Sequence, residues 1–329
     1  MIRSAGPLER KVAGLIARAG ARYYLGKPDV AELIELKFPD LGAVTDAVRN
    51  EAAFRRRAPS APVLTSVNLE LTNHCNLRCT ICPVNTTMRR PKGFMDPALY
   101  RRVIDDNPQL RFVLAFQWGE PLLHPEFFEL VGYAAERGIR TMITSNGTHL
   151  TPPNRAKLLT CGLDRLTISV DGDAATHRAI RGYDLETLAR DVRTLVAERD
   201  AAGSKLRIDV SMVVDAATEH ALAGFLAQWR GVVDRVQAIP RLVAERRTNA
   251  CRELWRGTLV VLWDGRVTVC CVDSEGLLQV GDARSDRLTD VWNGEKMREI
   301  RRSHAAGEFP PLCAMCGEYG HDRVSKRFR

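Results

Sequence analysis

The sequence lacks a long apolar run and lacks an apolar segment at its beginning. No stretch of the 329 residues approaches the about 18 consecutive apolar residues of a membrane-spanning helix. The first residues, MIRSAGPLERKVAG, lack the apolar core of a secretory signal, so we expect a cytoplasmic location. Outside an oxidising compartment, the nine cysteines are better explained by metal binding than by disulfides.

Basic residues outnumber acidic ones but are not concentrated in one stretch. The formal net charge is +8, and the scattered basic residues are typical of a solvated surface, although a preference for an acidic substrate stays open. We therefore expect neither a membrane nor a nucleic-acid partner. The apolar content of 45% is ordinary for a globular protein of one large domain, or of one large and one small domain.

Short β-rich runs alternate with amphipathic helical stretches between Val63 and Pro240. One helix is predicted over residues 184–199, after an Asp184 cap. Six β–α units predict an α/β fold with a parallel sheet, and they are too few for a closed eight-stranded barrel. We therefore expect a partial (β/α)6 barrel. The predicted strands are 66–71, 112–117, 141–145, 165–170, 206–214 and 235–239.

Two further segments flank the predicted barrel. The first 62 residues are polar and helical in pattern and end in a linker rich in Arg and Pro, which suits a helical cap or docking arm. After Pro240 the alternation stops, and residues 258–271 predict a hairpin that turns at Asp264–Gly265. The expected organisation is an extension over 1–62, the barrel over 63–240 and a small α+β metal-binding domain over 241–329.

Polar or Gly-rich residues follow four of the predicted strands, at 72–75, 118–121, 145–147 and 171–172. The carboxyl ends of parallel strands lie at one edge of a sheet, so these loops should converge on one mouth. The first carries Cys75, Cys79 and Cys82 in a C-x3-C-x2-C pattern. Three thiolates can hold three irons of a 4Fe–4S cluster and leave the fourth iron open to a small chelating molecule. Zinc, with His74 as a fourth ligand, stays open as an alternative.

The run CNLRCTIC resembles the signature of the radical S-adenosylmethionine (SAM) superfamily, with Ile81 at its apolar position. The resemblance implies that SAM chelates the open iron and that an electron cleaves it to a 5′-deoxyadenosyl radical, which abstracts hydrogen from the substrate. It also implies an external one-electron reductant such as flavodoxin or ferredoxin.

Further residues match the positions that contact SAM in this superfamily. The run Trp118-Gly119-Glu120-Pro121 is similar to the family's Gly-Gly-Glu-Pro motif, with Trp118 as a departure. The resemblance implies that Gly119 and Glu120 contact the SAM amino group. It implies contacts to the ribose and carboxylate of SAM for Ser145, Asn146, Ser169 and Arg181, with simple caps or turn residues as the alternative.

The polar residues Asn68 and Glu70 alternate with apolar residues on the first predicted strand. A period of two places both on the barrel interior, where a carboxylate needs a partner or a substrate. We therefore predict that Glu70 either contacts the substrate in catalysis or forms a buried structural pair.

Four more cysteines lie toward the C-terminus: Cys251, Cys270, Cys313 and Cys316. Four thiolates complete a second 4Fe–4S cluster, with zinc as the alternative. The spacing from Gly265 to Cys270 resembles the Gly-x4-Cys element of twitch or SPASM extensions of radical SAM enzymes. No cysteine follows Cys316, so the resemblance implies the shorter twitch form with a single auxiliary cluster.

Two cysteines remain. Cys161 is expected to be a small packed residue. Cys271 follows Cys270 on a predicted strand, so its side chain should point to the opposite face, and it resembles the hydrogen-donating cysteine of radical SAM epimerases. We therefore expect epimerisation of a small sugar or cyclitol-like substrate.

Three other functions stay open. Twitch-type relatives also include dehydrogenases that oxidise an alcohol with the auxiliary cluster as electron acceptor. Peptide modification ranks lower because the first 62 residues show no clear winged-helix pattern. A non-catalytic electron carrier would not need the SAM motifs.

Overall fold

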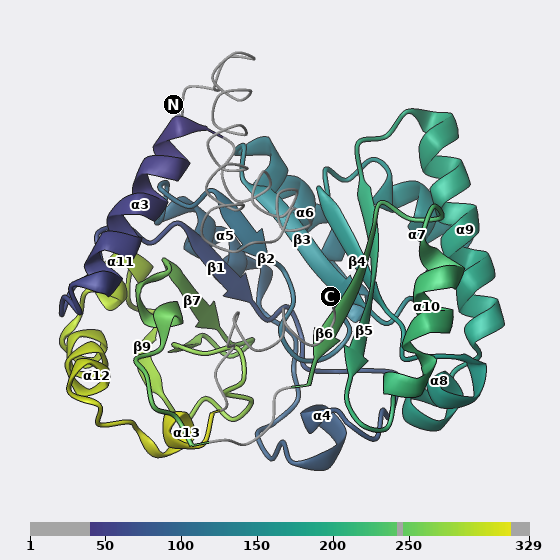
Figure 1. Cartoon of the computed structure of the whole chain (residues 1–329). Helices are drawn as coiled ribbons and strands as arrows, with labels where there is room; N and C mark the ends of the chain where they lie inside the picture. The colour runs from purple at the N-terminus through teal and green to yellow at the C-terminus, as the bar shows by residue number, and fades with distance from the viewer. Residues whose placement is uncertain (1–39, 242–245, 317–329) are drawn as a thin grey trace.

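The computed structural model describes residues 40–241 and 246–316, and these residues contain one nine-stranded sheet (Figure 1). The strand order is β6-β5-β4-β3-β2-β1-β7-β8-β9, so β6 and β9 are the two edges. The strands are β1 Ser66–Leu69, β2 Phe112–Leu114, β3 Arg140–Ser145, β4 Arg165–Ser169, β5 Arg207–Val214, β6 Arg235–Pro240, β7 Thr258–Val261, β8 Arg266–Thr268 and β9 Gln279–Asp282.

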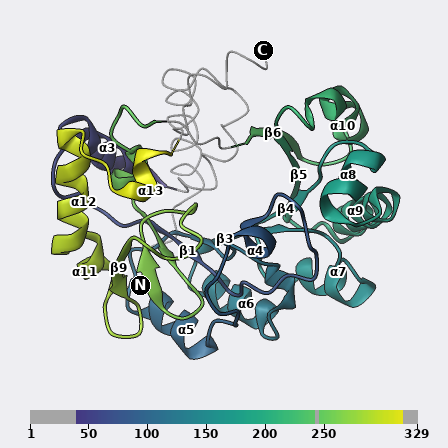
Figure 2. The ribbon, with the colours of Figure 1, turned by 90° about the horizontal axis from the view of Figure 1, so that it is seen from below.

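Strands β1 to β6 are parallel and in sequential order, and helices cover one face of the curved sheet. Figure 2 shows this arrangement as an arc with the helices on its outer side. The predicted partial α/β barrel is therefore confirmed. The connecting helices are α4 Pro83–Thr86, α5 Pro97–Asp105, α6 Phe127–Glu136, α7 Pro152–Leu158, α8 Ala174–Arg181, α9 Leu185–Ala202 and α10 Leu222–Trp229, with short 3-10 turns η2 Pro121–Leu123 and η3 Glu219–Ala221.

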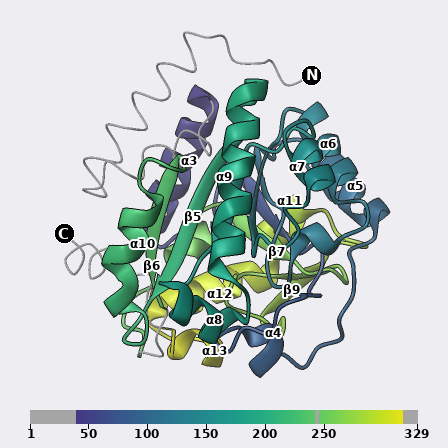
Figure 3. The same cartoon turned by 90° about the vertical axis from the view of Figure 1, so that its right-hand side faces the viewer.

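Helix α9 illustrates how local sequence sets these boundaries. The Asp184 carboxylate accepts the N–H of Thr187 at 2.8 Å and caps the first turn. Gly203 ends the helix in the left-handed conformation, at φ 62°. The helix lies lengthwise beside β5 in Figure 3 and buries Leu188 and Val192 completely. Burial of this apolar face stabilises the helix on the sheet.

The C-terminal region extends the same sheet. Strand β7 pairs in parallel with β1, and β7 and β8 form an antiparallel hairpin. The turn contains Asp264 and Gly265, as the sequence predicts, and Gly265 has a φ of 92°. The remaining elements are η4 Arg252–Trp255, α11 Leu288–Trp292, α12 Glu295–Ala306 and α13 Pro311–Ala314.

Among the residues that the structure describes, one helix precedes the barrel, α3 Leu41–Arg55, and it packs on the C-terminal region. The rings of Phe54 and Trp255 meet edge to face, with centroids 5.5 Å apart, and the Trp255 indole N–H donates to the carbonyl of Ala58 at 2.8 Å. The rest of the predicted extension, residues 1–39, lies outside the described residues. Within the described part of the chain, no helix is long and apolar enough to cross a membrane.

Candidate cofactor-binding site

The first three cysteines lie on the loop between β1 and α4. Within this loop Cys82 N–H donates to the Cys79 carbonyl at 3.3 Å, and Thr80 N–H donates to the Ile180 carbonyl on α8 at 2.9 Å. Burial raises the pKa of the Cys79 thiol, Arg181 lowers it, and the neighbouring Cys82 and Cys75 raise it further. The three thiols are thus close enough to influence one another, beside one guanidinium.

A pocket of about 560 Å³ opens at this loop. Cys75 and Cys79 line it together with the cationic residues Arg78 and Lys92. Three converging thiols, of which two face a pocket, match the donor set of a cluster with one iron left to a small ligand. Among the described residues no three His, Cys, Asp or Glu side chains surround a single ion position. Each ligand of a cluster binds a separate iron, so its ligands need not surround one point.

The motif around Gly119 lies against the cysteine loop. Gly119 has a φ of 95°, and a Cβ there would lie 2.6 Å from the carbonyl oxygens of Thr72 and His74. Only glycine allows this close approach. The next residue is also held there, because Glu120 N–H donates to the His74 carbonyl at 2.8 Å. Trp118 replaces the family's first glycine, and its indole nitrogen is buried without a hydrogen-bond partner in the described residues.

Glu120 lies at the centre of a buried network. Its carboxylate accepts the Ser145 hydroxyl at 2.9 Å, the Asn146 N–H at 2.7 Å and the Leu122 N–H at 3.2 Å. Burial raises the pKa of Glu120 to about 7, and these hydrogen bonds oppose that shift. The Asn146 side-chain amide also lies 3.8 Å from Cys75 Sγ. The structure therefore brings Gly119, Glu120, Ser145 and Asn146 together beside the first cysteine.

The other predicted contacts lie around the same loop. Arg181 is the last residue of α8, where its Nε donates to Asp171 at 2.7 Å, and it lowers the pKa of both Cys75 and Glu120. Ser169 ends β4 and is half-buried, and Ile81 is half-buried in the turn before Cys82.

The four C-terminal cysteines also converge. Burial raises the pKa of Cys313 to about 11, and the nearby Cys251 and Cys316 contribute to the increase. Cys251 in turn contributes to the raised pKa of Cys270. The four thiols come from three separate segments and are close enough to influence one another, as the ligands of one cluster would be.

The predicted orientation of Cys271 is wrong. Strand β8 ends at Thr268, and Cys270 and Cys271 lie in the turn that follows. The Cys271 thiol is next to that of Cys270 and is the first cause of that residue's raised pKa, ahead of burial. Asp273 explains the turn, because its carboxylate accepts the Thr268 hydroxyl at 2.6 Å and its N–H donates to the Cys270 carbonyl at 3.2 Å. Cys161, after α7, is half-buried.

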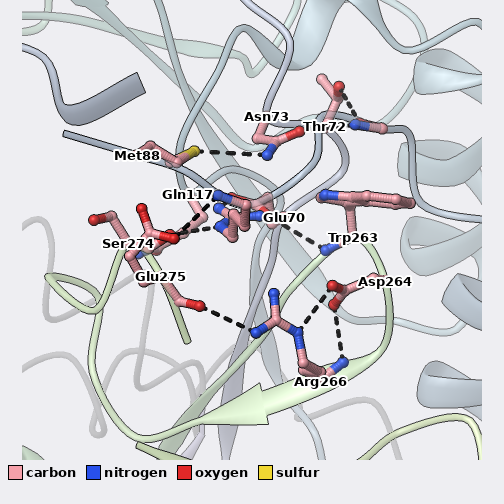
Figure 4. A network of polar contacts seen from close by, with 12 residues as sticks. Glu70, Thr72, Asn73, Met88, Gln117, Trp263, Asp264, Arg266, Ser274 and Glu275 are labelled. Atoms are coloured by element: carbon pink, nitrogen blue, oxygen red, sulfur yellow. Dashed lines mark hydrogen bonds and ion pairs between the residues drawn. The ribbon is translucent and has the colours of Figure 1, made fainter. Parts of the chain in front are cut away.

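Glu70 is fully buried and already has protein partners. Arg90 Nη1 and Nη2 donate to its two oxygens at 2.7 and 2.5 Å, and the N–H of Trp263 donates at 3.2 Å (Figure 4). Burial raises the pKa of Glu70, and the Arg90 hydrogen bonds and charge oppose that shift. Of the two roles left open for Glu70, these contacts favour the structural pair.

Several residues at the site carry no sequence signal that could have identified them. Arg247 N–H donates to the Ala314 carbonyl at 2.9 Å, and its Nε donates to the Cys313 carbonyl at 3.2 Å. His304 Nδ1 accepts the Cys251 N–H at 3.2 Å.

Gln117, after β2, receives a hydrogen bond from Asn68 at 3.0 Å and donates to the Cys271 carbonyl. This last contact joins the auxiliary cysteine segment to polar residues of the barrel.

Family comparisons agree with this arrangement. The radical SAM superfamily model matches residues 69–201, and the model of the SPASM iron–sulfur cluster-binding domain matches residues 251–317. The chain belongs to the radical SAM superfamily and is a radical SAM enzyme with a SPASM-type C-terminal domain. Its cofactors are SAM, a 4Fe–4S cluster in the barrel and an auxiliary iron–sulfur cluster.

Individual relatives differ in reaction. The mycofactocin maturase MftC of Mycobacterium ulcerans is 30% identical, over 76% of this chain and 79% of the relative. The SAM-dependent 2-deoxy-scyllo-inosamine dehydrogenase of Niallia circulans is 24% identical, over 77% and 93%. The AdoMet-dependent heme synthase of Nitratidesulfovibrio vulgaris is 30% identical, but the match spans only 47% of this chain and 42% of that protein.

A solved structure supports the same fold. The crystal structure of BtrN in complex with AdoMet and 2-DOIA superposes with a TM-score of 0.56 at 19% identity. The match covers 78% of this chain and 94% of BtrN. At this identity the similarity concerns the fold.

Proposed function

We propose that the protein is a radical SAM dehydrogenase that oxidises a hydroxyl-bearing carbon of a small sugar or cyclitol-like substrate. In this proposal Cys75, Cys79 and Cys82 hold the SAM-binding cluster, and Cys251, Cys270, Cys313 and Cys316 hold the auxiliary cluster. When bound, the cofactors supply a 5′-deoxyadenosyl radical that takes a hydrogen atom from carbon, and an acceptor for the electron released as the carbonyl forms.

The residues of the chain bind and orient the cofactor. The Glu120 carboxylate, held by Ser145 and the Asn146 N–H, accepts the SAM ammonium in a buried setting where a charge-assisted hydrogen bond is strong. Gly119 allows the loop to approach the cysteine loop closely. Ser169, Asn146 and Arg181 are assigned to the ribose and carboxylate, and Ile81 packs beside Cys82.

The hydrogen bond from Gln117 to the Cys271 carbonyl is the observation that carries the proposal. It holds the auxiliary cysteine segment against the polar residues Asn68 and Gln117 of the barrel. An electron acceptor close to the polar interior of the barrel is what an oxidation requires and a hydrogen-returning reaction does not. The dehydrogenase relative, which this chain matches over 93% of its length, supports the same reaction.

Epimerisation is the second candidate, and the position of Cys271 favours it. Its carbonyl accepts a hydrogen bond from Gln117, so Cys271 lies where the auxiliary cysteine segment meets the barrel. A thiol there can return a hydrogen atom to a substrate radical. The Cys271 thiol interacts with that of Cys270, a proposed cluster ligand, and this contact weakens the case for a free hydrogen donor.

One experiment distinguishes the candidates. Reconstituted protein is incubated anaerobically in heavy water with SAM, dithionite and candidate polyols, and 5′-deoxyadenosine and products are measured by mass spectrometry. A dehydrogenase gives a ketone without solvent deuterium, and Cys271→Ala retains this activity. An epimerase gives a product with one deuterium at the inverted carbon, and Cys271→Ala loses it.

Cys161→Ala is the matched control, because this half-buried cysteine after α7 belongs to neither cysteine group. If the protein turns over only a peptide, the proposed substrate class changes from a small molecule to a peptide, as for a maturase. If no 5′-deoxyadenosine forms with any reductant, the protein is an electron carrier and the proposal fails.

A further inference from the structure

One buried arginine joins the segment after the first cysteine loop to the segment after the auxiliary cysteines. The Arg90 side chain is 3% exposed, and all three guanidinium nitrogens donate hydrogen bonds. Nη1 and Nη2 bind the Glu70 carboxylate at 2.7 and 2.5 Å, and Nε donates to the Ser274 carbonyl at 2.5 Å. Arg90 thus contacts Glu70, the residue that follows β1, on one side and the Cys270–Ser274 turn on the other.

Glu275 makes a second connection in the same place. Its carboxylate accepts the backbone N–H of Arg89 at 2.5 Å and that of Arg90 at 3.1 Å. Its own carbonyl accepts Arg266 Nη1 at 3.0 Å, which ties it to β8 (Figure 4). Residues 89–90, which follow the first cysteine loop, are therefore held by the Glu275 carboxylate and by the Ser274 carbonyl.

The β7–β8 hairpin joins the network through Trp263. The Trp263 N–H donates to Glu70 at 3.2 Å, and its indole N–H donates to the Pro91 carbonyl at 3.2 Å. A Cβ at Gly93 would collide with the Trp263 ring, so only glycine allows this ring to lie against the backbone. The segment 89–93 and the C-terminal region, which are far apart in sequence, are thereby joined at Arg89 before Arg90 and at Pro91 after it.

We propose that Arg90 and Glu275 are positioning residues that set the separation and orientation of the two clusters. The inference rests on the proposed ligand assignment and goes beyond it. A bidentate arginine–carboxylate pair fixes orientation as well as distance, because both groups are planar. The charges are buried and paired, so the connection persists at high salt.

The test uses Glu275→Ala and Arg90→Lys in the full reconstituted chain. Lysine keeps the charge but offers a single point donor in place of the planar fork. Glu295→Gln is the matched control, because Glu295 is an exposed carboxylate of the C-terminal region that pairs locally with Arg302 on α12. Pulsed EPR of the reduced clusters measures their spin–spin interaction, and hydrogen exchange measures the amides of Leu277 and Leu278, which donate to Asp273.

Both test variants should keep wild-type iron content and SAM cleavage without substrate. Their spin–spin interaction should spread over a broader range than in wild type and Glu295→Gln. Exchange of the Leu277 and Leu278 amides should be at least about tenfold faster, since charge-assisted hydrogen bonds that restrain the turn are lost.

Wild-type spin coupling in both variants overturns the inference. Loss of iron from Glu275→Ala also overturns it, because the network would then be a folding element and not a positioning device. If Arg90→Lys alone loses iron, Glu275→Ala decides the outcome. A wild-type protein with only one cluster would instead contradict the proposed function.

Discussion

Glu120 should make SAM binding depend on pH near neutrality. Its side chain is buried, and burial raises its pKa to about 7. If the carboxylate accepts the SAM ammonium, the bound state requires the ionised form. At pH 7 about half of the SAM-free molecules carry a proton on Glu120, so binding should release about 0.5 proton from this group. Below pH 7 the SAM affinity should fall by about tenfold per pH unit.

The same pKa fixes the sign of the effect on stability. A carboxyl group whose pKa is raised in the folded state favours the protonated folded protein. The free energy of unfolding should therefore fall as pH rises from about 4.5 to about 7, by about 3 kcal/mol if Glu120 acts alone. This direction is opposite to that of a carboxylate in a surface ion pair.

The assay is isothermal titration calorimetry of reconstituted protein with SAM, in two buffers of different ionisation enthalpy. Glu120→Gln should release about 0.5 proton fewer per SAM than wild type at pH 7 and should bind more weakly at pH 8. Glu129→Gln, an exposed position on α6, is the control. Equal proton release by wild type and Glu120→Gln, with equal pH slopes of affinity, would refute the assignment of Glu120.

Three further predictions concern the cysteines and Gly119. Changing Cys75, Cys79 and Cys82 together to Ala should reduce iron from about eight to about four per chain and abolish SAM cleavage; full iron retention would sink the first site. Cys313→Ala should lose the auxiliary cluster and lower the thermal midpoint, while SAM cleavage persists, because a metal site in a small region contributes folding free energy; wild-type iron and turnover would contradict this. Gly119→Ala should destabilise the protein by about 2–4 kcal/mol in denaturant unfolding, because a Cβ at φ 95° would lie 2.6 Å from two carbonyl oxygens; a change below about 0.5 kcal/mol would show that the loop relaxes freely.

Local pattern was sufficient to predict the barrel. The apolar alternation of β5 and the Asp184 cap of α9 depend on neighbouring residues, and both elements begin within one residue of the predicted position. The cysteine motifs are similarly local. Less regular is the stretch after Leu288, where the chain forms two helices, α11 and α12, separated at Asn293–Gly294, and glycine favours such a break.

Long-range contacts could not be predicted. The run Val269–Val272 favours a strand, but the Asp273 carboxylate accepts the N–H groups of Leu277 and Leu278 and forms a compact turn instead. That turn places Cys271 beside Cys270. The partner of Glu70 likewise lies on a loop without a periodic pattern, so only the folded chain distinguishes a structural pair from a catalytic carboxylate.

The parallel pairing of β7 with β1 limits how this protein can be divided. A chain cut after Pro240 would leave β1 as an edge strand, with a row of main-chain groups open to other molecules. Such a fragment should aggregate on expression. Exchange of C-terminal domains between relatives would therefore succeed only with junctions placed before Thr258, so that the incoming segment brings its own β7 to complete the sheet.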